Sequence, residues 1–202
     1  MSQIEAPMLL FRKPSDGFIR QFLAEQSQHE FSYNHVGDSF GDLPAGFVVD
    51  HTRIRLGQGE PTFLAAKKAL ANWDQFRLGW VEARPEATPI RQGEKVAFLA
   101  KTICLWWLNA CRIIQLIDQP GEVTRFGFAY GTLPDHAAIG EERFLVEWNR
   151  QNDSVWFDIL AFSKPRHPLV KLAYPVVRLT QKRFGREATA SLLQSVQQQI
   201  QA

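Results

Sequence analysis

A set of polar side chains lies within segments that otherwise have the apolar, β-branched and aromatic composition of strands. A charged group that faces a protein core must be paired or must meet a ligand, because it loses its hydration there. These side chains therefore form either cross-strand salt bridges on a solvated convex face, the commoner arrangement, or a polar cluster inside a cavity. The residues are Asn109, Arg112, Arg125, Tyr130, Glu142, Glu147 and Asp158.

Tyr130 and Glu142 flank the segment 133–140, which joins two expected strands, so we expect their side chains to be in contact. Arg125 belongs to the same strand as Tyr130, and we expect it near the same end of the sheet. It lies far from the loop at about 3.3 Å per residue, so it needs a partner from the other side of the sheet. A Tyr hydroxyl and a carboxylate would offer a donor and an acceptor to a bound head group.

The sequence gives little indication of metal binding or of dinucleotide binding. The sequence has 5 His residues, but none has the HxH or HxxxH spacing of metal ligands, and no CxxC pair occurs, so no metal site and no cofactor are expected. The Gly57-Gln58-Gly59 segment lacks the third glycine of a dinucleotide-binding loop and predicts a tight turn between a strand and a helix. The histidines are His29, His35, His51, His136 and His167.

The cysteines, Cys104 and Cys111, have no neighbouring His that would activate a thiol, and we expect them to pack as small apolar groups. Their odd separation places them on opposite faces of one strand, which disfavours a mutual disulfide. Free thiols are typical of a reducing compartment, which favours a cytoplasmic location.

The composition excludes several classes of partner. A net charge of +2, with no basic run, does not indicate nucleic acid, and no stretch approaches the ~18 apolar residues of a membrane span. Residues 8–11 are too short an apolar run for an export signal. The content of 45% hydrophobic residues, with 15 Phe and 6 Trp, predicts a thick core in one domain that spans residues 1–202.

The order of expected elements defines the fold class. Helices are expected at 15–28, from Pro61 to before Gly79, and at 169–200, the last one kinked at Pro175. In the second helix, Trp73 falls on the buried stripe. Strands are expected at 47–56, 80–83, 95–101, 105–117, 122–132, 142–149 and 154–163. A run of strands followed by a long helix predicts an α+β fold, a curved antiparallel β-sheet wrapped around the C-terminal helix in the helix-grip arrangement.

Such a fold often leaves a cavity between sheet and helix, which we expect to be lined by Phe126, Phe128, Trp148 and Trp156. It would bind a small apolar or amphipathic molecule. One alternative is a cyclase or hydrolase that uses Tyr130, Glu142 or Asp158 as acid or base. Another is an interaction protein with a filled core. A cavity of ~300 Å³ or more would favour the first two over the third.

Several segments together resemble the DUF1990 family of bacterial and plant proteins. They are Leu56-Gly57-Gln58-Gly59, Asn109-Ala110-Cys111-Arg112, the run from Arg125 to Pro134, Gly140-Glu141-Glu142-Arg143-Phe144, Val155-Trp156-Phe157 and Ala161-Phe162-Ser163. The resemblance covers residues 33–185 approximately. It implies no activity, substrate or cofactor. The helix-grip architecture, by analogy, would place the chain near the pollen-allergen and START-like proteins.

Overall fold

The computed structural model describes residues 8–102, 105–166 and 172–201. The strands are β1 (Met8–Leu10), β2 (Val48–Gln58), β3 (Val81–Arg84), β4 (Lys95–Thr102), β5 (Leu105–Gln119), β6 (Val123–Thr132), β7 (Ala138–Asn149) and β8 (Ser154–Pro165). The helices are α1 (Asp16–Gln26), α2 (Gly59–Ala71) and α4 (Tyr174–Gln201), with short 3-10 turns at Asp38–Phe40 and Asp74–Phe76.

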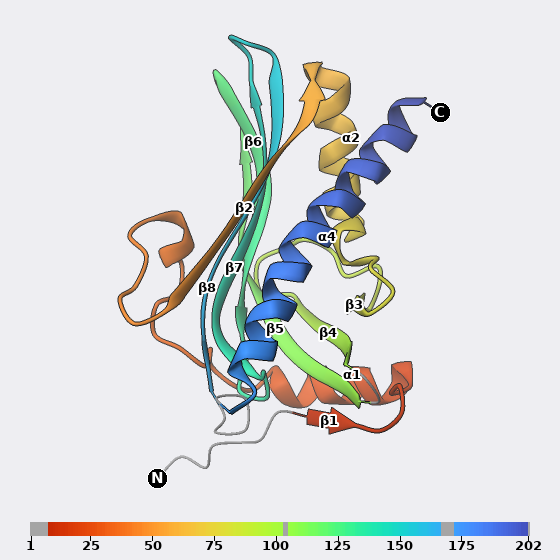
Figure 1. Ribbon diagram of the computed structural model, residues 1–202, viewed down its shortest axis with the longest axis vertical. Helices are drawn as coiled ribbons and strands as arrows, with labels where there is room; N and C mark the ends of the chain where they lie inside the picture. The colour runs from red at the N-terminus through yellow and green to blue at the C-terminus, as the bar shows by residue number, and fades with distance from the viewer. Residues whose placement is uncertain (1–7, 103–104, 167–171, 202) are drawn as a thin grey trace.

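The strands form one antiparallel sheet in the order β2-β8-β7-β6-β5-β4-β3, with β1 paired to β5. Consecutive strands from β3 to β8 are neighbours, as short connections between antiparallel strands require. The sheet curves, and α4 crosses its concave side (Figure 1). The prediction of an α+β fold with a curved antiparallel sheet around a long C-terminal helix is therefore confirmed.

The concave face of the sheet carries the main core. Phe128, Phe144 and Phe157 are fully buried there, beneath α2 and the C-terminal half of α4. The buried residues of α4 are Gly185, Ala188, Thr189, Leu192 and Val196. The helix α4 thus packs mainly against α2 and the Asp74–Phe76 turn, where the Ser191 hydroxyl donates to the Asp74 carbonyl, and its N-terminal half is less covered.

A second, smaller core lies on the convex face, where α1 packs against β4 and β5 through Ile19, Phe22 and Leu108. Ser15 caps α1 by accepting a hydrogen bond from the Phe18 N–H at 3.3 Å. The Arg112 side chain donates to the backbone carbonyls of Ser27 and His29 just beyond the C-terminal end of α1. Arg112 therefore holds the end of α1 on the convex face.

Trp73 is buried as predicted, but it does not belong to a helix. The helix α2 ends at Ala71, and Trp73 has a left-handed backbone conformation with φ 59°. This conformation turns the chain into the Asp74–Phe76 turn while the indole stays in the core, 2% exposed. Helical spacing identified the buried stripe correctly but not the residue at which the helix stops.

The predicted kink at Pro175 is not tested, because part of the predicted helix that precedes it lies outside the described residues. Pro175 occupies the first turn of α4, where a backbone N–H has no helical partner to lose. The predicted start at 169 lies outside the described residues. The helix continues through Gly185, where an added Cβ would lie 2.7 Å from the Thr52 hydroxyl oxygen, so glycine lets α4 approach β2 closely.

Candidate functional site

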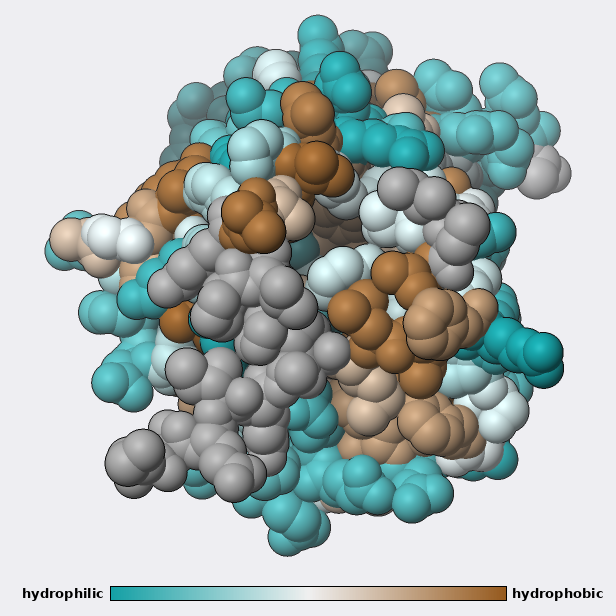
Figure 2. All heavy atoms as spheres, turned by 60° about the horizontal axis from the view of Figure 1, so that its bottom comes forward, coloured by the Kyte–Doolittle hydropathy of each residue, from teal (hydrophilic) through white to brown (hydrophobic). Residues whose placement is uncertain are grey.

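A cavity of about 700 Å³ separates the N-terminal half of α4 from the concave face of the sheet. It lies at the end of the molecule where α4 and β7 begin, and Figure 2, which turns that end forward, shows a recess in the surface. Its volume falls within the range of about 300–1,000 Å³ that is typical of sites for small molecules. The tight packing at the opposite end of α4 explains why the space opens here.

The cavity wall is mixed, with aromatic rings on one part and hydrogen-bonding groups on another. The apolar part includes Phe76, Trp80, Phe98, Ile159 and Phe184. The polar part includes Asp50, Tyr130, Glu142, Arg178 and Gln181. Such a lining suits a molecule with an apolar body and a polar end.

Tyr130 and Glu142 are paired residues on β6 and β7, and both line the cavity. The Tyr130 hydroxyl donates a hydrogen bond to Glu142 Oε2, so the predicted contact is confirmed. Arg125 does not join them. It lies near the start of β6 and pairs with Glu147 on the other face of the sheet.

The surroundings of Glu142 favour its neutral form. Burial raises the pKa of Glu142 from 4.5 to about 7, the hydrogen bond from Tyr130 acts in the opposite direction, and the negative charge of Asp50 adds to the increase. Glu142 forms no ion pair with any residue in the described ranges. Burial and the neighbouring Glu142 also raise the pKa of Tyr130, which therefore keeps its proton.

An ion pair joins α4 to β2 at the cavity wall. Arg178 binds Asp50 with both terminal nitrogens, at 2.5 and 2.6 Å, in a bidentate arrangement. Beside it, the Gln181 amide donates to the Ser163 hydroxyl of β8 at 3.0 Å. These contacts hold the N-terminal half of α4 above the cavity.

Two polar residues shape the loop between β6 and β7 next to the cavity. His136 lines the cavity, and burial lowers its pKa to about 4, so the ring is neutral. The amide oxygen of Asn109 accepts a hydrogen bond from the Ala137 N–H at 3.1 Å. Asn109, a predicted ligand-binding residue, thus holds this loop and does not itself line the cavity.

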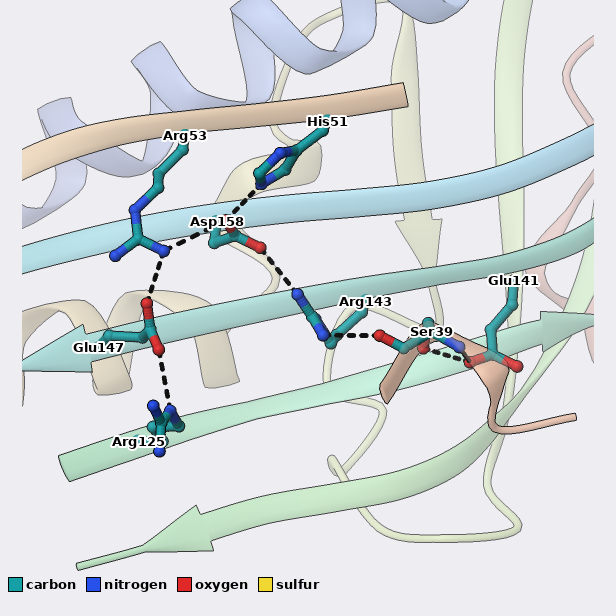
Figure 3. Close-up of polar contacts among 8 residues, drawn as sticks. All are labelled: Ser39, His51, Arg53, Arg125, Glu141, Arg143, Glu147 and Asp158. Carbon is teal, nitrogen blue, oxygen red and sulfur yellow. Dashed lines mark hydrogen bonds and ion pairs between the residues drawn. The ribbon is translucent and has the colours of Figure 1, made fainter. Parts of the chain in front are cut away.

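Asp158 lies on the convex face of the sheet and is the centre of a charge network (Figure 3). Its carboxylate contacts His51 at 2.6 Å, Arg143 at 3.1 Å and Arg53 at 3.4 Å. Arg53 also binds Glu147 at 2.6 Å. For Asp158, Arg125 and Glu147, the structure thus has the cross-strand salt bridges that were the commoner of the two expected arrangements.

The network continues to the loop that covers this face. The Arg143 side chain donates to the Ser39 carbonyl at 2.6 Å (Figure 3). The Glu141 carboxylate accepts hydrogen bonds from the Ser39 hydroxyl, from the Gly37 N–H and from the Tyr33 hydroxyl. Sequence analysis missed Glu141, although adjacent strand residues point to opposite faces and the Glu141-Glu142 pair could have suggested two separate roles.

Asp158→Asn is expected to lower the free energy of unfolding by about 2 kcal/mol, because an amide loses the charge-assisted bonds to Arg143 and His51 yet keeps one acceptor. Chemical denaturation of the variant at neutral pH measures this loss. Binding of a small molecule in the cavity should stay unchanged, since Asp158 lies on the opposite face. A loss of binding without a loss of stability would contradict this assignment.

The predicted aromatic lining is wrong in its members. Phe126, Phe128 and Trp148 belong to the core that α2 covers, with Phe63 packed against Trp148. Trp156 lies on the convex face, where Arg53 stacks on its ring at 5.2 Å. Trp156 and Asp158 are two residues apart on β8, so they share one face of the sheet. The sequence did not show that α2 covers part of the concave face, and the residues beneath it were therefore wrongly assigned to the cavity.

Within the described residues, no group of three or more His, Cys, Asp or Glu side chains could hold a metal ion. The described helices also include none that is both long and apolar enough to cross a membrane.

The curved sheet, the long C-terminal helix and the cavity between them define a helix-grip α+β protein. The chain belongs to the DUF1990 family, a domain of unknown function, whose model matches residues 32–191. A UPF0548 protein of Dictyostelium discoideum is 36% identical over 207 residues, covering 94% of this chain and 96% of the relative. A UPF0548 protein of Deinococcus radiodurans is 35% identical over 201 residues, covering 93% and 98%.

The matches among solved structures have low sequence identity to this chain. The hypothetical protein jhp0584 from Helicobacter pylori matches with a TM-score of 0.50 and 10% identity, covering 81% of this chain and 94% of that chain. Human STARD10 matches with a TM-score of 0.48 and 12% identity, covering 92% and 80%.

Proposed function

We propose that this protein binds a small amphipathic molecule in the cavity between α4 and the sheet. The observation that carries the proposal is the 700 Å³ cavity itself, with aromatic walls and the Tyr130–Glu142 pair inside it. A protein that served only as an interaction scaffold would gain stability by filling such a space, because the atoms that line a void have no packing partners on one side.

The two parts of the wall suit the two parts of an amphipathic ligand. Phe76, Phe98 and Phe184 would pack against its apolar body, while Tyr130 and Glu142 would bind its polar end. The Arg178–Asp50 ion pair ties α4 to β2, and its opening and closing would control access. The cavity needs no cofactor for this function. A cytoplasmic location fits the free, buried thiol of Cys111.

Catalysis is a second candidate, and the pKa of about 7 at Glu142 favours it. A carboxyl group with a pKa near the working pH can both accept and donate a proton, as a general acid or base must. In that case, Glu142 would exchange the proton and Tyr130 would orient it. Release of a chemically changed product from a bound molecule would distinguish the enzyme from a binding protein.

Filling the cavity tests the proposal. Ala161 lines the cavity on β8, and Ala161→Trp is expected to occupy much of the space and to lower the affinity for Nile red, a neutral apolar dye, at least tenfold. Fluorescence titration measures the affinity, and native mass spectrometry of the purified protein reports any molecule that co-purifies with it.

Ala190→Trp is the matched control, because Ala190 is exposed on α4 away from the cavity lining, and it should bind the dye as the original protein does. Thermal unfolding confirms that both variants fold. If Ala161→Trp folds and binds the dye with unchanged affinity, the cavity is not the binding site and the proposal fails.

A further inference from the structure

We infer that the ligand of this cavity carries a protonated amine, and that the Glu142 carboxylate with the Tyr130 hydroxyl oxygen binds this cationic head group. The inference rests on the proposed function and names the chemical class of its ligand. Three observations support it separately: the acceptors that the Tyr130–Glu142 pair offers, the lack of an ionic partner for Glu142 among the described residues, and the aromatic rings beside the pair.

The first support is the direction of the hydrogen bond inside the cavity. The Tyr130 hydroxyl has one proton, and it donates that proton to Glu142 Oε2. Glu142 Oε1 has no hydrogen-bond partner among the described residues. When Glu142 is ionised, the pair therefore offers only acceptors to the cavity: the lone pairs of Oε1 and those of the Tyr130 oxygen. A complementary head group must donate, and an ammonium group has three donors.

The second support is the balance of charge along the wall. Glu142 forms no ion pair within the described ranges, whereas Asp50 is paired with Arg178. The carboxylate of Glu141, a further residue of the lining, accepts hydrogen bonds from Tyr33, Gly37 and Ser39. The further cations of the lining, Lys182 and Arg186, are exposed on α4. A ligand cation would supply the missing partner, and a ligand carboxylate at the same place would put two like charges together.

The third support is the set of rings beside the pair. The ring of Tyr130 lies 4.8 Å from that of Phe98, centroid to centroid, and Phe76 and Phe184 lie 5.2 Å apart, with all four side chains in the cavity wall. The face of an aromatic ring attracts a cation, and the attraction strengthens as water is excluded. Rings next to an unpaired carboxyl group form a setting that suits an ammonium group better than an anion.

Among the titratable groups around it, Glu142 is the one that we expect to change its protonation when the ligand binds. Burial keeps Tyr130 protonated and His136 neutral near pH 7, burial and the charge of Glu142 raise the pKa of the Cys111 thiol, and Asp50 is paired with Arg178. Of the other charged or titratable lining residues, His51 is bound to Asp158, and Lys182 and Arg186 are exposed on α4. Binding an ammonium group would stabilise the ionised form of Glu142 and release its proton. Amine affinity should therefore rise with pH as Glu142 ionises, and binding near pH 7 should release protons to the buffer.

Three ligands that differ only in the head group test the inference: phenylbutylamine, phenylbutanol and phenylbutyrate. Isothermal titration calorimetry at pH 7 should show the amine binding at least tenfold more tightly than the alcohol and the acid. Repetition in buffers of different ionisation enthalpy should show proton release with the amine. Glu142→Gln should abolish the amine preference, and Tyr130→Phe should reduce it.

Glu147→Gln is the matched control, since it makes the same substitution on the same strand but on the convex face, and the amine preference should survive in it. Equal affinities for the three ligands, tighter binding of the acid, or an unchanged preference in folded Glu142→Gln would overturn the inference and leave the proposed function standing. No binding of any of the three, together with dye binding unaffected by Ala161→Trp, would overturn both.

Discussion

Replacing Trp73 by Ala is expected to lower the free energy of unfolding by about 3–5 kcal/mol, the usual range when a buried Trp or Phe is cut back to Ala. The indole is 2% exposed and lies 4.9 Å from the Phe128 ring, centroid to centroid. Its Nε1–H donates to the Thr88 carbonyl at 2.8 Å, so the substitution also leaves a buried acceptor without its partner. Urea denaturation of both proteins measures the difference.

Leu64→Ala serves as the control for the Trp73 substitution, because Leu64 is an exposed residue of α2. It should lower the free energy of unfolding by less than ~1 kcal/mol. A loss under ~1 kcal/mol for Trp73→Ala would show that the indole faces solvent. It would contradict the packing of the Asp74–Phe76 turn beneath α4.

Glu142→Gln is expected to change how stability depends on pH. The pKa of Glu142 rises from 4.5 in the unfolded chain to about 7 in the folded protein. The stability associated with the protonated carboxyl is therefore fully present below pH 4.5 and is lost as the pH rises through 7. The loss amounts to about 3 kcal/mol, since each tenfold change in acidity corresponds to about 1.4 kcal/mol.

Gln carries no titrating proton, so the free energy of unfolding of Glu142→Gln, relative to that of the original protein, should increase by about 3 kcal/mol between about pH 4.5 and 8. Urea titrations at a series of pH values measure this difference. Comparing the two proteins at each pH cancels the contribution of His136, whose lowered pKa of about 4 makes stability fall as the pH drops. A constant difference across the range would mean that Glu142 is ionised and well solvated in the folded state.

Glu147→Gln again gives the control for the pH series. Glu147 is held by Arg53 and Arg125 on the convex face, so its substitution should cost stability near neutral pH. The relative stability of this variant should not increase with pH. Comparing the pH dependence of stability in the two variants, both on β7, separates the effect of burial in the cavity from that of the substitution itself.

Local patterns in the sequence were sufficient for most of the fold. Alternating residues in β5 to β8 and the turns between them fix neighbouring antiparallel strands, because a period of two and a short connection leave few other pairings. Helical spacing placed α1, α2 and most of α4. The clear failure occurred at an element end, at Trp73, where one left-handed backbone conformation ends the helix before the predicted residue.

The candidate site was only partly accessible from the sequence. The Tyr130–Glu142 contact followed from two strands flanking one loop, which is a local relation. Asp50 and Arg178 were not identified, because they are separated by 128 positions in the chain and meet only when α4 lies across β2. A contact between residues so far apart in the chain cannot be predicted from local sequence, because the neighbours of each residue do not indicate its partner.

The curved antiparallel sheet, the long C-terminal helix and the pairing of Tyr130 with Glu142 can all be read from the order of residues along the chain. The face of the sheet that each polar residue occupies, and the place where the cavity opens, depend on the tertiary packing. Whether one face of a strand is buried or exposed depends on the elements that pack against it. Here α1 and the loop at residues 37–40 cover the convex face. That covering assigns Asp158 to a charge network on that face and leaves Glu142 facing the cavity without an ionic partner among the described residues.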